Sequence, residues 1–402
     1  MESKERIFKL KGVVQHYAWG GNTFIPELLG IAPDFSKPSA EYWMGAHSSA
    51  PSQIYRTDSW QQLNELISSN PSDALHPAVV EKFGELPYLF KVLDVKDMLS
   101  IQVHPTKANA EIGYDAENAA GIPLNAPHRN YKDRNHKPEV MVALSDFWLL
   151  HGFKSKQALE DTLQNTLELT VLLPLFRKEG IKGLYQFVME MDQVDVDNLL
   201  TPLVKRALRF KKEGSITKSS PCWWAAKLYE ETGIPEHIDR GIFSIFFFNI
   251  VQVNPGEAVF QKAGVPHAYL EGQNIELMAN SDNVLRGGLT PKHVDVPELM
   301  KHTLFEEVVP QVMKGVPLMP GELKYPCPVP DFGLSKISLN QGMEFQSETY
   351  SLEIFIVTEG SVLLNQHMVL KKGECAAILA ETKYSLLAPG QATVFKAFVP
   401  VL

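Results

Sequence analysis

A stretch with helical periodicity interrupts a chain that otherwise reads as β-structure, and this change of pattern restricts the fold more than any other feature. From Ser155 to about Thr232 the apolar residues recur three and four positions apart, and Ser155 itself suits a helix N-terminus. Short apolar runs that end in glycine precede this stretch, and β-rich sequence resumes at Ile242. We therefore expect a mainly β protein with a helical insertion over residues 155–235.

The C-terminal part of the chain adds a second β-rich block from about Tyr325 onward. A weak internal repeat links this block to the first, because His267 follows Gly256 at the same offset at which Tyr384 follows Gly373. We interpret the repeat as two related β-barrels, of which one offers a metal ligand where the other offers a phenol. A chance resemblance between two Gly-Glu turns is the alternative.

The length of the chain supports a division into several units, because 402 residues exceed what one hydrophobic core usually supports. We expect a discontinuous, metal-holding barrel over residues 1–154 and 236–324, the helical insertion over 155–235, and a metal-free C-terminal barrel over 325–402. The most apolar run, residues 241–251, is too short to cross a bilayer, and we interpret it as a buried strand.

The charge balance disfavours a nucleic acid or an acidic membrane as a partner. The net charge is −9, and no block of like charges occurs among the 21% of residues that are charged. The N-terminus leads into no apolar run long enough for secretion, and the three cysteines form no Cys-x-x-Cys pair, which suits a reducing cytoplasm. We expect a cytoplasmic monomer that binds a small molecule and holds any anionic group with a local cluster of cations.

Candidate metal ligands lie in three separate segments. In the segment Ser100–Pro105 apolar and polar residues alternate, so Gln102 and His104 project from one face of a strand. A neutral imidazole and an amide oxygen can bind zinc-like metals, Glu139 would add a carboxylate, and His267 is a fourth candidate. Each of these side chains alone is more often a satisfied polar group than a ligand, so the spacing nominates a site without excluding that alternative.

Lys91 lies within the apolar run 86–95, where a buried ammonium group needs a partner. The residues alone leave two interpretations equally open: the side chain reaches solvent, or it binds an anion. Lys91 is therefore a candidate functional residue.

Two dense polar segments resemble the hallmark motifs of a known family. Residues 131–139 match the pattern Tyr-x-Asp-x-Asn-His-Lys-Pro-Glu at every fixed position, and residues 267–292 match a second long motif except at Gly287, where alanine is usual. The resemblance is to the type I mannose-6-phosphate isomerases (phosphomannose isomerases), which are zinc enzymes of the cupin superfamily. It extends from residues 15–20 and 41–47 to the C-terminal barrel, and the helical insertion is its least constrained part.

The resemblance implies a fold, a cofactor and an activity. The implied fold is two cupin-type jelly-roll barrels with an α-helical domain, and the implied cofactor is one zinc ion. The implied activity is the interconversion of mannose 6-phosphate, a phosphosugar, and fructose 6-phosphate. The family's zinc ligands correspond to the four residues that the spacing nominates, which are Gln102, His104, Glu139 and His267.

The resemblance also implies which residues surround the metal. The family's active-site arginine corresponds to Arg286, its cleft lysines to Lys91 and Lys137, and its cleft serine to Ser100. Gly287 adds backbone freedom directly beside the arginine position.

Isomerisation of an aldose to a ketose moves a proton between C1 and C2 through an enediol, which requires a base and an electrophile for the charge that develops on oxygen. We take Glu276 as the leading base, with Lys137 as the alternative, and Arg286 as a further catalytic residue. A zinc ion with two imidazoles, one amide and one carboxylate keeps a net positive charge and acts as a Lewis acid. The expected substrate-binding residues are Ser100, Lys91, Tyr269 and His136, of which His136 could equally support a neighbouring group.

Two rival functions remain at this point. A cupin metal site can belong to an iron oxygenase, but such sites use two histidines and one carboxylate with open positions, and Gln102 fits that pattern poorly. A non-catalytic sugar-binding or storage bicupin would not need so many cations and acids around one metal. Absence of turnover despite tight binding of mannose 6-phosphate would favour the bicupin.

Overall fold

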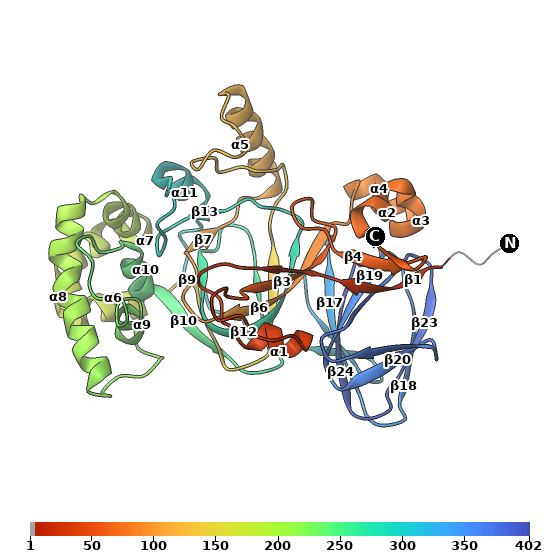
Figure 1. Cartoon of the computed structure of the whole chain (residues 1–402). Coiled ribbons are helices and arrows are strands. Elements are labelled where there is room, and N and C mark those ends of the chain that lie inside the picture. Colours follow the sequence, from red (N-terminus) through yellow and green to blue (C-terminus); the bar gives the residue numbers. More distant parts are fainter. Residues whose placement is uncertain (1–4) are drawn as a thin grey trace.

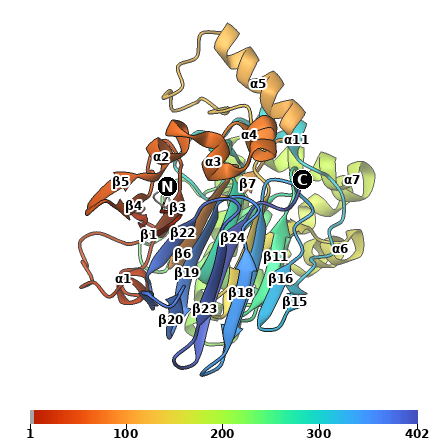
Figure 2. The ribbon, with the colours of Figure 1, turned by 90° about the vertical axis from the view of Figure 1, so that its right-hand side faces the viewer.

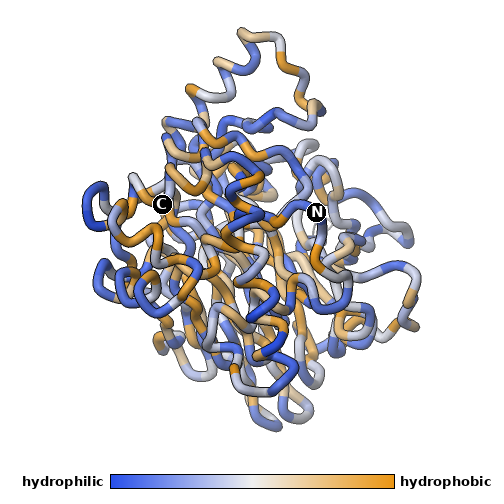
Figure 3. The backbone as a smooth tube through the Cα atoms, turned by 90° about the vertical axis from the view of Figure 1, so that its left-hand side faces the viewer, coloured by the Kyte–Doolittle hydropathy of each residue, from blue (hydrophilic) through white to orange (hydrophobic). Residues whose placement is uncertain are grey.

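The computed structural model describes residues 5–402, and its mainly β fold with a helical unit confirms the predicted fold class (Figure 1). Within these residues the strands form three sheets. The helical unit covers one flank of the β-structure, and the C-terminal strands lie on the opposite flank. Hydrophobic residues follow the strands, whereas hydrophilic residues prevail at the outer turns (Figure 3).

The largest sheet carries the segments with the two motifs. Its strands are β2 (Val13–Gln15), β3 (Glu41–Gly45), β6 (Tyr88–Val95), β7 (Gln102–Val103), β8 (Glu139–Ala143), β9 (Phe147–Phe153), β10 (Phe248–Val253), β11 (Glu257–Gln261), β12 (His267–Ala279), β13 (Leu285–Arg286) and β14 (Met313–Lys314). The long strand β12 is the centre of this sheet, because its first residues pair with β7 and β9 and its later residues pair with β6 and β8.

Strand β12 is irregular where its partners change, and a glycine makes this possible. The register with β9 shifts between Tyr269 and Glu271, and Gly272 has a φ of +125°. A Cβ atom on Gly272 would lie only 2.7 Å from the Phe147 ring, so no side chain fits there. One strand can therefore contact both β7 and β6, which carry different parts of the predicted site.

The second sheet combines the start of the chain with its end. Its strands are β1 (Ile7–Lys11), β4 (Gln53–Arg56), β5 (Ser59–Gln62), β15 (Val316–Met319), β16 (Glu322–Tyr325), β17 (Gly333–Leu339), β19 (Glu353–Glu359), β22 (Cys375–Ile378) and β24 (Ala392–Phe398). Strand β1 pairs with both β22 and β4, so N-terminal strands in red lie beside C-terminal strands in blue (Figure 2).

A third, smaller sheet shares a hydrophobic core with the second. Its strands are β18 (Glu344–Glu348), β20 (Ser361–Leu364), β21 (Met368–Lys371) and β23 (Lys383–Leu387). Because the second sheet takes strands from both ends of the chain, the pairing alone does not separate an N-terminal from a C-terminal unit. The division into the three expected domains stays a prediction.

The helical unit lies where the sequence predicts an insertion. It contains α6 (Lys156–Asn165), the 3-10 helix η1 (Leu167–Leu172), α7 (Leu173–Glu190), α8 (Gln193–Lys212) and α9 (Pro221–Lys227). Ser155 caps α6 as expected, because the Ala158 N–H donates to Ser155 Oγ over 3.2 Å. Among the described residues, no helix is both long enough and apolar enough to span a membrane.

The apolar run at 241–251 is not a single strand. Helix α10 (Gly241–Phe247) comes first and strand β10 follows, so the prediction of a strand was wrong for the first part of the run. All seven residues of α10 are buried. A fully buried helix has no polar face to reveal its periodicity, and an apolar run alone does not distinguish it from a buried strand.

The remaining helices lie around the sheets. They are α1 (Phe24–Leu29), α2 (Leu63–Ser69), α3 (Pro71–Leu75), α4 (Pro77–Phe83), α5 (Lys107–Ala119) and α11 (Val296–His302). Helices α5 and α11 lie on the side of the molecule to which β7 and β13 belong (Figure 1).

Candidate active site

A cavity of about 630 Å³ is lined by residues of both motifs and of the N-terminal segment. Five predicted site residues line it, namely Lys91, Ser100, Gln102, Lys137 and Arg286. Its other polar lining includes Glu41, Ser281, Asp282, Thr290 and Lys292. This volume and this mixture of charges are typical of a site for a small polar molecule.

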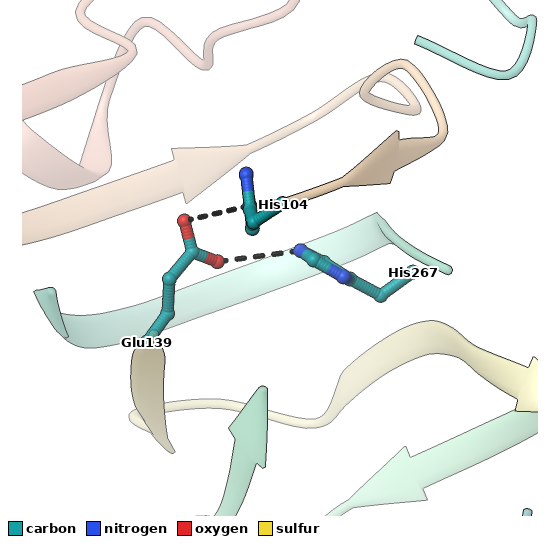
Figure 4. A group of neighbouring side chains, drawn as sticks. All are labelled: His104, Glu139 and His267. Atoms are coloured by element: carbon teal, nitrogen blue, oxygen red, sulfur yellow. Dashed lines mark ion pairs between the residues drawn. The ribbon is translucent and has the colours of Figure 1, made fainter. Parts of the chain in front are cut away.

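Three buried side chains from separate strands converge beside this cavity. His104 follows β7, Glu139 begins β8 and His267 begins β12, and their ligand atoms all lie within 4.8 Å of one another. Glu139 Oε1 lies 3.3 Å from His104 Nε2, and Glu139 Oε2 lies 3.4 Å from His267 Nε2 (Figure 4). Three of the four nominated metal ligands thus form one group.

Hydrogen bonds on the far side of each imidazole orient the two rings. His104 Nδ1–H donates to the Asn283 carbonyl oxygen and His267 Nδ1–H donates to the Val265 carbonyl oxygen, each over 2.9 Å. Since a carbonyl oxygen only accepts, the proton of a neutral ring lies on Nδ1, and its Nε2 lone pair is then directed at Glu139. His104 Nε2 is buried and makes no hydrogen bond to any residue from 5 to 402. Nitrogen lone pairs and carboxylate oxygens that face one another are mutually repulsive. A cation bound between them would remove this repulsion, so the three side chains fit a metal site.

The charges of the group also fit a divalent metal. Burial and the nearby Lys137 lower the pKa of His104 to about 4, so its imidazole is neutral near pH 7. Burial opposes the charge of Glu139, but Lys137 and His104 outweigh it and hold the pKa of this carboxyl well below its usual range. Two imidazoles and one carboxylate are ligands that zinc commonly takes.

Gln102 lies next to this group through the pairing of the strands. Its backbone is the register partner of His267 across β7 and β12 and of Arg286 across β7 and β13. Its side chain lines the cavity. Gln102 is therefore in a position to face a metal held by the three-residue group, and its role as the fourth ligand stays a prediction.

Lys91 is held by two buried carboxylates. Its Nζ lies 3.1 Å from Glu276 Oε1 and 3.5 Å from Glu41 Oε2, and it lies 5.1 Å from the centre of the Trp43 ring. Burial opposes the charge of Lys91, but Glu41 and Glu276 outweigh it and hold the pKa of this ammonium above its ordinary value. Lys91 thus lines the cavity as a fixed, charge-compensated cation. Sequence reasoning missed Glu41, although an acidic residue in an aromatic strand is itself unusual.

Lys137 is compensated in the same way. Its Nζ lies 2.9 Å from Glu139 Oε1, and the side chain is almost fully buried. Lys137 lines the cavity, whereas Glu139 does not. Lys137 therefore links the metal group to the cavity wall.

Arg286 differs from the two lysines, because no carboxylate compensates it. Burial alone lowers the pKa of its guanidinium, and within residues 5–402 it forms no ion pair. Lys292 also lines the cavity, and burial together with the positive charge of Arg286 lowers its pKa. Sequence reasoning did not single out Lys292, although it ends the second motif. These two cations leave one end of the cavity positively charged.

Besides the three residues of the metal group, three more predicted site residues are not among those that line the cavity. Glu276 is buried against Lys91, and burial raises the pKa of its carboxyl while Lys91 opposes this shift. Tyr269 packs edge-on against Phe147, and its buried hydroxyl makes no hydrogen bond in the described part of the chain. His136 turns to the C-terminal part, where its Nε2 lies 2.9 Å from Asp331 Oδ1.

The two motifs hold each other in place through Asn283. Its Nδ2 donates to the carbonyl oxygens of Asp133 and Asn135 over 2.8 Å each, and its Oδ1 accepts from the Lys132 N–H over 2.7 Å. Because the Asn283 carbonyl oxygen also accepts from His104, this network fixes a candidate metal ligand. Many polar groups of the two motifs therefore bind each other and support the site.

A comparison with protein families matches the N-terminal part of this chain. A model described as phosphomannose isomerase type I, catalytic domain, matches residues 7–156. This segment contains His104 and Glu139 of the metal group, together with Lys91, Ser100 and Lys137.

Curated relatives are similar along most of the chain. The mannose-6-phosphate isomerase of Escherichia coli (strain K12) is 40% identical over 381 residues, which cover 92% of this chain and 94% of that protein. Mannose-6-phosphate isomerase 2 of Arabidopsis thaliana is 33% identical, with 84% and 80% covered. The crystal structure of mannose 6-phosphate isomerase from Salmonella typhimurium, bound to fructose 6-phosphate and zinc, is similar with a TM-score of 0.87 and 37% identity, and the match covers 99% of this chain and all of that one.

Proposed function

The chain belongs to the type I mannose-6-phosphate isomerase family, and from this premise we propose that it interconverts mannose 6-phosphate and fructose 6-phosphate with one bound zinc ion. The observation that carries the proposal is the convergence of His104, Glu139 and His267 beside a cavity with cations on its wall. A merely sugar-binding protein would not need a buried metal group next to charged side chains that can move protons.

The metal group supplies the first part of the proposed site. His104, Glu139 and His267 would hold the zinc ion together with Gln102, and the bound ion supplies a Lewis acid that stabilises negative charge developing on substrate oxygens. The carbonyl acceptors behind both imidazoles keep the ligand atoms oriented before any metal binds.

The distribution of charge suggests where the phosphate binds. Lys91 and Lys137 are already compensated by carboxylates, whereas Arg286 and Lys292 form no ion pair in the part of the chain that the structure describes. A phosphate dianion gains most from cations that have no other partner, and a guanidinium can bind it with two hydrogen bonds. We therefore place the phosphate at Arg286 and Lys292, with Ser100 as a hydroxyl donor, and the reacting carbons near the metal group.

Proton transfer is the chemical step. A base removes the proton from C2 of the aldose, the enediol carries the developing charge on its oxygens, and the proton is returned to C1. Of the two candidates, Lys137 lines the cavity and Glu276 does not, so the geometry favours Lys137 as the group that touches the substrate, and it would have to act as the base in its uncharged amine form. Glu276 would then act through Lys91, whose ammonium it holds at 3.1 Å, and would be a positioning residue.

A coupled isomerase assay tests the proposal. The purified protein should convert mannose 6-phosphate to fructose 6-phosphate, lose the activity after chelation and regain it with zinc. Binding of the sugar phosphate without turnover in the zinc-loaded protein would instead support a non-catalytic bicupin. Activity restored by iron with consumption of oxygen would support an oxygenase.

The cellular setting is a further part of the proposal. The structure describes Cys222, Cys327 and Cys375 as free cysteines, which suits a reducing compartment such as the cytoplasm. The monomeric state, and the lack of a nucleic-acid or membrane partner, stay predictions.

A further inference from the structure

One carboxylate of the segment between α9 and α10 binds three backbone amides beside the cavity. The N–H groups of Leu289 and Gly241 donate to Asp239 Oδ1 over 2.8 and 2.7 Å. The Thr290 N–H donates to Asp239 Oδ2 over 3.0 Å. Leu289 and Thr290 line the cavity, whereas Asp239 does not. Asp239 can therefore influence the site only through the backbone that it holds.

The segment that Asp239 holds has a backbone conformation that needs support. Leu289 has a φ of +56°, a region that residues other than glycine rarely adopt, and the φ of Gly288 is +114°. A Cβ atom on Gly241 would lie 2.6 Å from Leu289 N, so the two segments touch backbone to backbone. Such conformations persist only where surrounding contacts determine them.

Asp239 is itself anchored in the helical unit. Its N–H donates to the hydroxyl of Tyr229 over 3.0 Å. The N–H of the preceding residue, Ile238, donates to Asp197 Oδ1 of helix α8 over 2.8 Å. The carboxylate is thus presented to the cavity segment from a fixed point of the helical unit.

The opposite edge of the same segment pairs with the metal-bearing sheet. The Gly287 N–H donates to the Ile101 carbonyl oxygen over 2.9 Å, and the Ile101 N–H donates to the Gly288 carbonyl oxygen over 3.0 Å. Segment 286–290 therefore lies between the sheet on one side and Asp239 on the other. Loss of Asp239 would release one edge of the segment and leave the other attached.

We propose that Asp239 is a positioning residue of the isomerase site, which fixes segment 286–290 and with it the Arg286 guanidinium at the place where the substrate phosphate binds. The inference rests on the proposed function for the identity of the ligand, whereas the contacts are those of this structure. The helical unit then has a definite role. Segment 286–290 is held by Ile101 on the side of the sheet and by Asp239 on the side of the helical unit.

Two substitutions of Asp239 test the inference directly. Asp239→Asn keeps one acceptor oxygen and loses the other, and Asp239→Ala loses both. The kcat/KM for mannose 6-phosphate should fall roughly tenfold in the first variant and about a hundredfold in the second, with a rise in KM and no loss of zinc. Hydrogen exchange at the amides of Leu289 and Thr290 should become faster in both variants, whatever the activity.

A second variant disturbs the same contact without removing the carboxylate. Gly241→Ala places a methyl group against Leu289 N, so it should raise KM and speed up exchange at Leu289 in the same direction. The matched control is Glu168→Gln, which breaks the ion pair with Arg206 inside the helical unit and does not touch the cavity segment. This control should keep wild-type kinetics and wild-type exchange at Leu289 and Thr290.

A double variant separates positioning from general damage to the fold. If Asp239 acts through Arg286, Asp239→Ala should cost much less in an Arg286→Lys background than in the wild type. Additive effects, unchanged exchange at both amides, or an equal loss of activity in Glu168→Gln would overturn the inference. A wild-type protein without isomerase activity would count against the proposed function, while the exchange rates would still decide whether Asp239 holds the segment.

Discussion

Lys91 of β6 and Glu276 of β12 are direct register partners, and Lys91 Nζ lies 3.1 Å from Glu276 Oε1. Glu41 of the neighbouring strand β3 approaches the same ammonium to 3.5 Å. All three side chains are buried, and of the two carboxylates only Glu41 lines the cavity with Lys91. The sheet therefore presents the Lys91 ammonium to the cavity. Glu276, which the sequence suggested as the catalytic base, stabilises this charge from outside the cavity lining.

Removing the charge of Glu276 should destabilise the protein. Glu276→Gln leaves the buried Lys91 with Glu41 as its remaining partner, so the unfolding free energy should fall by about 3 kcal/mol. Urea denaturation of the zinc-loaded protein measures this. The control is Glu374→Gln, which breaks a surface pair with Lys9 at 3.2 Å and should cost less than about 1 kcal/mol. Equal effects of the two substitutions would contradict a buried, charge-dependent role for Glu276.

Loss of the Arg286 guanidinium should reduce turnover without loss of metal. Arg286→Ala removes a cation that forms no ion pair with any described residue, so kcat/KM for mannose 6-phosphate should fall by roughly a hundredfold or more. Steady-state kinetics measure the loss of kcat/KM, and the zinc content of the same preparation shows whether the metal is retained. Arg177→Ala, which removes an exposed pair with Glu160, is the control and should stay fully active. Full turnover in Arg286→Ala would reject the catalytic role.

The carboxylate of Glu139 should control the affinity for zinc. Glu139→Gln replaces the only anionic member of the group with a neutral amide, so zinc should bind about a hundredfold or more weakly. The test is the zinc content after dialysis against a weak chelator, with Asp146→Asn as a control outside the metal group. A variant that retains a full equivalent of zinc would show that Glu139 is not a ligand.

The C-terminal part should make stability depend on pH through Glu353. Burial raises the pKa of this carboxyl to about 7, from an ordinary value of 4.5, even though Lys396 opposes the shift. Between these two values the folded protein holds a proton that the unfolded chain has released. Stability should therefore fall as the pH rises from about 4.5 to 7 and then level off, by up to about 3 kcal/mol.

Thermal unfolding of Glu353→Gln across the same pH range provides the measurement. Because glutamine does not titrate, the variant should gain stability relative to the wild type at pH 8 and show little difference at pH 5. Tyr384, whose hydroxyl donates to Glu353 Oε2 over 3.0 Å, retains an acceptor in the variant. A difference between the two proteins that is the same at both pH values would show that Glu353 is not the titrating group.

The sequence was most informative where chemistry is concentrated in short motifs. His104, Glu139 and His267 could be nominated because each is a metal-ligand type in a dense polar segment, and the fold brings these three together. It was least informative for contacts between strands. The pairing of Glu41 with Lys91 depends on which strands become neighbours, and no periodicity within either segment encodes that choice.

The helix at Gly241–Phe247 shows the same limit in the fold, because a uniformly apolar run satisfies a buried helix and a buried strand equally well. The position of His136 shows it in the site, where a motif residue turns to Asp331 instead of the cavity. The partner of His136 lies almost two hundred residues away in the chain, so no local pattern indicates it.

The amino-acid sequence by itself determined the mainly β class, the place of the helical unit, the family resemblance and the candidate metal ligands, because these follow from local periodicity and from residue types at fixed spacing. Only the tertiary structure decided which charges are compensated, which side chains reach the cavity, and that Asp239 supports the Arg286 segment from the helical unit. The physical reason is that burial and pairing of charge are properties of neighbours in space, and the free energy of a buried ion depends on those neighbours far more than on its own position in the chain.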